Sequence, residues 1–83
     1  MPHRLAHLPK VVGAKQTLKA IQNDMVELVY LAQDADRRVI APVRAACKTK
    51  GIDFVEVGTM AELGKACSIE VGSAVAAIVK TVS

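Results

Sequence analysis

Aromatic side chains are nearly absent from this 83-residue chain, which has one Tyr (Tyr30), one Phe (Phe54) and no Trp. RNA recognition motifs and oligonucleotide-binding barrels stack bases on aromatic platforms, and two aromatic residues cannot build one. Val, Ile, Leu and Ala must therefore fill the core, and hydrophobic residues make up 52% of the chain, which is enough for one. We expect a single small domain over residues 1–83.

Long apolar runs and paired cysteines are also missing. The longest apolar run, residues 74–79, is too short to cross a membrane, and no charged-then-apolar leader opens the chain. Cys47 and Cys67 lie in apolar helical contexts without a C-x-x-C spacing, so we expect free thiols in a reducing compartment. These absences predict a cytoplasmic protein without a membrane partner.

Catalytic and cofactor motifs are equally scarce. The chain has no G-x-G-x-x-G, G-K-S or G-K-T sequence, and none of its serines lies in a nucleophile elbow. His3 and His7 could share a helix face, but no carboxylate or cysteine accompanies them as a further metal ligand. The carboxylates of Asp34 and Asp36 lack the other ligands of a calcium loop and fit helix capping better. We expect no enzymatic activity, no cofactor and no metal site.

The chain does contain apolar residues whose spacing alternates between strand-like runs and helical periods, which predicts an α/β domain with helices on both faces of a small sheet. The expected strands are residues 10–13, 26–32, 52–57 and 74–80. The expected helices are residues 14–24, a segment that ends at Gly51 as its C-cap, and a short segment that Thr59 caps and that runs to Ala66. Residues 1–9 fit either a short helix or a loose arm.

Each of the two longer helices has an apolar stripe. The first stripe comprises Ala14, Leu18, Ile21 and Met25. The second comprises Val39, Ile40, Val43, Ala46 and Cys47. A proline beyond the first turn of a helix costs about 3 kcal/mol. Because of Pro42, we expect regular helix to begin no earlier than Val39.

The segment from Gly13 to Lys19 gathers groups that bind an anion. A glycine directly before a helix lets another backbone approach closely, and the first turn from Ala14 onward presents unpaired N–H groups at the positive end of the helix dipole. Lys15 and Lys19 extend the positive field, while the Gln16 amide can donate to and accept from a base edge. The net charge of +3 is compatible with a nucleic-acid partner but does not require one. A solvated helix after an ordinary glycine turn is the alternative.

A second candidate is the loop of residues 68–72, between the short helix and the last strand. Ile69 and Val71 flank the carboxylate of Glu70, and exposed apolar side chains there could pack against an unstacked base. The alternative is that both apolar side chains close the rim of the core.

Three stretches together resemble the kink-turn-binding ribosomal protein superfamily, of the L-seven-Ae and L-thirty-e type, in its short bacterial form. They are Gly-Ala-Lys-Gln-Thr-Leu-Lys after the first strand, Asp-Ala-Asp after the second, and Glu-Leu-Gly-Lys-Ala-Cys-Ser-Ile-Glu-Val before the last. The resemblance runs from about Lys10 to Val79. It implies a monomeric three-layer α/β/α sandwich with a small mixed sheet. The resemblance further implies binding to RNA that bends sharply at tandem sheared G·A pairs, with ribosomal RNA as a possible target.

The resemblance also implies residue roles. Gly13 would permit close approach of the RNA, Lys15 and Gln16 would address the guanines, and Lys19 would pair with a phosphate. The family's loop that covers the flipped-out nucleotide matches Ile69, Glu70 and Val71. Two positions depart from the family's usual residues: Lys15 stands where archaeal and eukaryotic members carry Asn, and Ser68 replaces a common Gly.

Two other classes of function compete with RNA binding. The loop of residues 68–72 could instead dock onto a partner protein, or the domain could bind a small molecule or act as an enzyme. The salt dependence of binding separates RNA from a protein partner, because neutralising phosphates releases counterions and docking an apolar loop does not.

Overall fold

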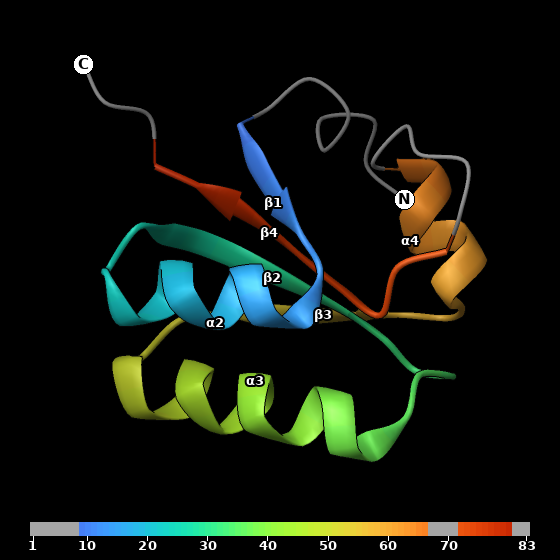
Figure 1. The fold of residues 1–83 in the computed structure, drawn as a ribbon, viewed down its shortest axis with the longest axis horizontal. Coiled ribbons are helices and arrows are strands. Elements are labelled where there is room, and N and C mark those ends of the chain that lie inside the picture. Colours follow the sequence, from blue (N-terminus) through green and yellow to red (C-terminus); the bar gives the residue numbers. More distant parts are fainter. Residues whose placement is uncertain (1–8, 67–71, 81–83) are drawn as a thin grey trace.

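The computed structural model describes residues 9–66 and 72–80, in which strands and helices alternate (Figure 1). The strands are β1 (Lys10–Val12), β2 (Val26–Ala32), β3 (Phe54–Val57) and β4 (Val75–Val79). The helices are α2 (Ala14–Gln22), α3 (Arg37–Lys50) and α4 (Met60–Ala66). His3, His7 and Cys67 lie outside the described residues, as do Ile69, Glu70 and Val71.

The strands form one mixed sheet in the order β1-β4-β2-β3. β4 runs antiparallel to both of its neighbours, β1 and β2, whereas β2 and β3 are parallel. β2 is buried from Val29 to Ala32, as expected for a strand covered on both faces. The predicted mixed sheet is confirmed.

Two apolar clusters, one on each face of the sheet, define the layers. α2 and α3 lie side by side on one face, where Ile21, Val43 and Cys47 pack with Val29 and Leu31 (Figure 1). The other face carries α4, whose fully buried Leu63 packs into a cluster with Tyr30, Val57, Ala76 and Ile78. The predicted three-layer α/β/α arrangement is therefore confirmed.

The first long helix ends earlier than predicted. α2 stops at Gln22, and Asp24 adopts a left-handed conformation (φ 56°) that turns the chain back toward the sheet. Met25 consequently follows the helix and is 37% exposed, so its predicted place in the apolar stripe is wrong. Thr17, which the prediction left out of the stripe, is fully buried instead.

The second long helix begins earlier than predicted. α3 starts at Arg37 although it contains Pro42, and the carboxylate of Asp36 caps it by accepting the Arg38 N–H at 2.8 Å. Pro42 has no N–H, so the helix loses the hydrogen bond to the Arg38 carbonyl. Because both residues are exposed, water can donate a hydrogen bond to that carbonyl instead. Val39, predicted in the stripe, is 38% exposed.

The remaining boundaries differ by one or two residues. Gly51 has φ 68° and is the αL C-cap that the sequence predicts. The N–H of Ile52 donates to the Cys47 carbonyl at 2.8 Å, which ties Ile52 to the end of α3, so β3 begins at Phe54. The Thr59 Oγ1 accepts the Glu62 N–H at 3.0 Å, which confirms Thr59 as the cap of α4.

Candidate nucleic-acid interface

One end of the sheet gathers four chain segments: the β1–α2 turn, the β2–α3 loop, the β3–α4 loop and residues 72–74. β1, β2 and β3 end there, and antiparallel β4 begins there (Figure 1). The backbone hydrogen bonds that join these segments are Gly13 N–H to Val75 O (2.8 Å), Ala32 N–H to Ala74 O (2.9 Å) and Gln33 N–H to Val57 O (2.8 Å). The β1–α2 turn is therefore joined directly to the start of β4.

The β1–α2 turn depends on a glycine. Gly13 adopts φ 104° and ψ 149°, a region that side-chain-bearing residues almost never occupy. A Cβ at this position would also lie 2.7 Å from Oε1 of Gln16, whose side chain folds back over the turn. The glycine is thus needed for the backbone of the turn itself and for the placement of Gln16.

The first turn of α2 is an open donor surface. No side chain caps the helix, and no acidic residue lies in its first turn. The N–H groups of that turn have no carbonyl four residues earlier within the helix, and they carry the positive end of the dipole. Lys15, Gln16 and Lys19 are exposed, and Ala14 is half-buried. The turn and these side chains together suit a ligand with negative charge and hydrogen-bonding edges.

Two buried hydroxyls lie beneath this surface, and sequence reasoning missed both. Thr17 is fully buried, and its Oγ1 has no hydrogen-bond partner. The Ser73 hydroxyl donates at 2.7 Å to the same Val75 carbonyl that accepts the Gly13 N–H, so Ser73 fixes the anchor of the turn. A signal existed for Thr17, which stands three residues after Ala14 and four before Ile21, on the apolar side of the helix.

The second predicted element, Ile69 to Val71, lies outside the described residues, so the structure does not test its contacts. Gly72, the residue that follows this segment, packs against the start of α4. A Cβ on Gly72 would lie 3.2 Å from the Met60 backbone, and the Ser73 N–H donates to the Met60 carbonyl at 3.0 Å. The Met60 N–H in turn donates to Oδ1 of Asp34 at 2.8 Å, so Asp34 connects α4 to the β2–α3 loop.

Two groups in the described part of the chain have shifted pKa values. The hydrogen bond from the Arg38 backbone N–H lowers the pKa of Asp36, and the Arg38 side chain adds to the effect. Burial raises the pKa of the Cys47 thiol, which is free, as predicted.

Residues 9–66 and 72–80 lack the features of two further kinds of site, a metal centre and a membrane span. These residues contain no cluster of three or more His, Cys, Asp or Glu side chains suited to a metal ion. None of their helices has the length and apolar character needed to span a bilayer.

Comparison with known proteins gives consistent similarities. Residues 5–83 match the profile of the ribosomal protein L7Ae/L30e/S12e/Gadd45 family. An RNA-binding protein of Caldanaerobacter subterraneus is 53% identical over 68 residues, which cover 82% of this chain and 83% of that protein. Large ribosomal subunit protein eL8 of Halobacterium salinarum is 38% identical over 68 residues, or 81% of this chain and 57% of that one. The solved structure of the Giardia lamblia 15.5kD RNA binding protein superimposes with a TM-score of 0.87 at 34% identity, over 95% of this chain and 68% of its own.

Proposed function

Because this chain belongs to the ribosomal protein L7Ae/L30e/S12e/Gadd45 family, we propose that it is an RNA-binding protein that recognises kink-turn RNA. It acts as one monomeric domain in the cytoplasm, associates with ribosomal RNA and catalyses no reaction. The RNA-binding names of its relatives in Caldanaerobacter and Giardia support RNA binding. The geometry of the β1–α2 turn supports recognition of kink-turn RNA.

The β1–α2 turn is the observation that carries the proposal. A regular A-form helix hides its major groove from side chains, so a protein with few aromatic residues needs RNA whose groove is already distorted. The φ of Gly13 brings a narrow, side-chain-free turn to the front of α2. Lys15 and Gln16 can then reach guanine edges in the opened groove, while Lys19, one helical turn on, meets a phosphate.

Residues 69–71 supply the second contact in this proposal. Ile69 and Val71 cover a base that is unstacked only when the RNA is bent, and Glu70 lies between them in sequence. Because such a base is available only in the bent state, this contact favours the bend and shifts the population of RNA conformers toward it.

The test uses two short RNAs that differ only in the tandem G·A pairs. Binding is followed by fluorescence anisotropy, and bending by energy transfer between dyes on the two ends at low Mg²⁺. We expect the RNA with G·A pairs to bind more tightly and its ends to come together as protein is added. Tight binding with the ends apart, or equal affinity for both RNAs, would refute kink-turn recognition.

Matched variants assign the reading surface. Lys15→Ala and Gln16→Ala should each weaken binding to the G·A-containing RNA by about 1–3 kcal/mol, the value of one good base contact. Gln22→Ala, an exposed change at the other end of the same helix, should leave the affinity unchanged. An equal loss for plain duplex RNA would show that Lys15 and Gln16 act only as generic polar groups.

A further inference from the structure

The charges of this protein are strongly divided between its layers. α2 and α3 contain no Asp or Glu, yet they hold seven of the eleven Lys and Arg residues of the chain: Lys15, Lys19, Arg37, Arg38, Arg44, Lys48 and Lys50. All eight acidic residues of the chain lie outside these two helices. The helical layer over one face of the sheet is therefore far more basic than the net charge of +3 suggests.

Ion pairs neutralise part of this layer. Arg38 pairs with Asp36 (3.3 Å), Arg44 with Glu56, and Lys50 with Asp24 (3.1 Å). Within the described residues, the cations of the layer that have no ion-pair partner are Lys15, Lys19, Arg37 and Lys48. The proposed function uses Lys15 and Lys19 but leaves Arg37 and Lys48 without a role.

Arg37 and Lys48 belong to one row along α3. Arg37, Ala41, Arg44 and Lys48 stand at spacings of four, three and four residues, which place them on one side of the helix. That side faces β3, because Arg44 reaches across to Glu56. At about 1.5 Å of rise per residue, the row from Arg37 to Lys48 is about 16 Å long.

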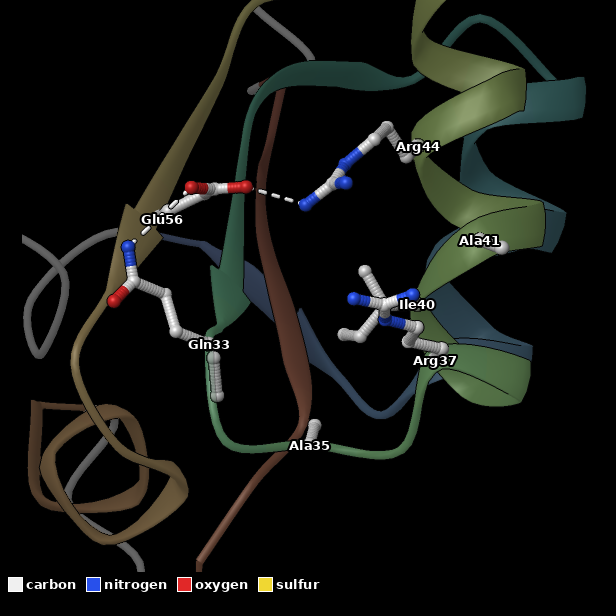
Figure 2. Close-up of a pocket in the computed structure, with 8 residues that line it drawn as sticks. Gln33, Ala35, Arg37, Ile40, Ala41, Arg44 and Glu56 are labelled. Carbon is white, nitrogen blue, oxygen red and sulfur yellow. Dashed lines mark hydrogen bonds and ion pairs between the residues drawn. The ribbon is translucent and has the colours of Figure 1, made fainter.

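A groove of about 520 Å³ lies beside the Arg37–Arg44 part of this row (Figure 2). Lys48 is not among its lining residues and stands one helical turn beyond Arg44 on α3. Arg37, Ala41 and Arg44 form its α3 wall, and Gln33 and Glu56 form the opposite wall. The side chains between the walls are small or apolar: Ala32, Ala35 and Ile40. The groove thus leaves room for a ligand next to two guanidinium groups.

The arginine in the middle of the groove is already held in place. The Arg44 guanidinium pairs with Glu56, and its Cζ lies 5.8 Å from the centre of the Phe54 ring. Gln33 Nε2 donates to the other Glu56 oxygen at 3.3 Å, which fixes the carboxylate. The Arg44 side chain remains 41% exposed, so it can donate to a ligand without a further loss of rotamer freedom. Glu56 opposes an anion, but its charge is balanced by Arg44. The net positive charge therefore comes from Arg37 in the groove wall and from Lys48, one helical turn beyond the groove.

We propose that this groove binds the phosphate backbone of a helical arm of the same RNA, beyond the bend; this inference rests on the proposed function. A row about 16 Å long fits a chain of phosphates better than a single small anion. Guanidinium groups match phosphate oxygens in pairs. Gln33 and Arg37, which line the groove, lie at the sheet end that carries the β1–α2 turn, so one RNA can reach both.

The test compares two RNAs with the same kink-turn, one with short arms and one with both arms extended by a full helical turn. The groove variant is Arg37→Gln/Lys48→Gln, which changes exposed residues and leaves Arg44 and Glu56 intact. The control is Lys65→Gln/Lys80→Gln, which lowers the net charge equally at exposed positions outside α2 and α3. Affinity is measured by anisotropy as a function of salt concentration.

For the long-arm RNA, two lost phosphate contacts should reduce the slope of log K against log salt by about 1.4–1.8. The affinity ratio between 50 and 200 mM salt should therefore shrink by about 7- to 12-fold relative to wild type. The short-arm RNA should bind wild type and groove variant equally, and the control should not distinguish the two arm lengths.

The outcomes separate the two proposals. If wild type binds the short-arm RNA but the groove variant keeps the full salt slope on the long-arm RNA, the groove inference is wrong and kink-turn recognition stands. An equal loss for groove variant and control, or for both arm lengths, would also overturn the inference, because the effect would then be one of net charge. Failure of wild type to prefer RNA with G·A pairs would refute the proposed function itself.

Discussion

Replacing Gly13 with alanine tests the β1–α2 turn at its most constrained point. The backbone angles of Gly13 (φ 104°, ψ 149°) lie in a region that is essentially reserved for glycine, and forcing another residue into it costs about 1–3 kcal/mol. The new Cβ would also lie 2.7 Å from Gln16 Oε1, but that atom is the end of a flexible side chain that can move away. We expect Gly13→Ala to lower the free energy of unfolding by about 1–3 kcal/mol, most of it from the backbone.

Gly51→Ala is the matched control. Gly51 also has a positive φ (68°), but nothing lies within 4 Å of the position of its Cβ, and it ends α3 far from the β1–α2 turn. An alanine in this left-handed conformation should cost about 1–2 kcal/mol. Both variants therefore lose stability, but only Gly13→Ala displaces Gln16 and should weaken binding to kink-turn RNA.

The assay is urea unfolding of wild type, Gly13→Ala, Gly51→Ala, Gln16→Ala and the Gly13→Ala/Gln16→Ala double variant, with RNA affinity measured on the same samples. If the backbone dominates, Gly13→Ala costs nearly the same with and without the Gln16 side chain. A loss below about 0.5 kcal/mol, the range of ordinary surface substitutions, would refute the conformational argument. A cost that vanishes in the Gln16→Ala background would place the strain in the side-chain contact instead.

Three further variants test the packing and the cap described above. Thr17→Val should raise the free energy of unfolding by about 1 kcal/mol, because it replaces a buried hydroxyl without a partner by a methyl group. A lower free energy of unfolding than wild type in urea would mean that the hydroxyl is hydrogen-bonded. Leu63→Ala should lower the free energy of unfolding by about 2–5 kcal/mol, since this fully buried side chain packs α4 against the sheet. A smaller loss in the same assay would mean that the packing of α4 contributes little to stability. Asp36→Asn should keep the α3 cap but remove its pH dependence. Because the folded-state pKa of Asp36 is lowered, the contribution of its carboxylate to folding stability is complete above the ordinary carboxyl pKa and is lost as the pH falls through the lowered value. The acid-unfolding curves of wild type and Asp36→Asn should therefore diverge. Parallel curves would refute this.

The sequence predicted the elements better than their ends. Apolar periodicity located the strands and the two longer helices because burial imposes it, whatever the neighbouring elements are. The Thr59 capping pattern located α4. The ends of an element depend on competition between local interactions, such as caps and turns, which the apolar pattern does not describe. The Asp36 cap outweighs Pro42 at the start of α3, and the left-handed Asp24 removes Met25 from the helix.

The candidate site was predictable where it is local in sequence. Gly13 and the exposed Lys15 and Gln16 could be identified from their order alone. The groove could not, because Arg44 and Glu56 are twelve residues apart on different elements and meet only after α3 has packed beside β3. Thr17 was missed because the apolar stripe of this helix was drawn from hydrophobic residues alone.

The place of β4 also has a consequence for biosynthesis. β4 comes last among the described strands, yet it lies in the middle of the sheet, between β1 and β2. Until residues 75–79 have emerged from the ribosome, β1 has no neighbouring strand, and the apolar β2 keeps one edge unpaired and prone to aggregation. The carbonyl that anchors Gly13 belongs to Val75, so the β1–α2 turn also stays unanchored until then. A nascent chain therefore acquires its fold and its anchored β1–α2 turn in one late step, and a fragment that stops before β4 should have neither.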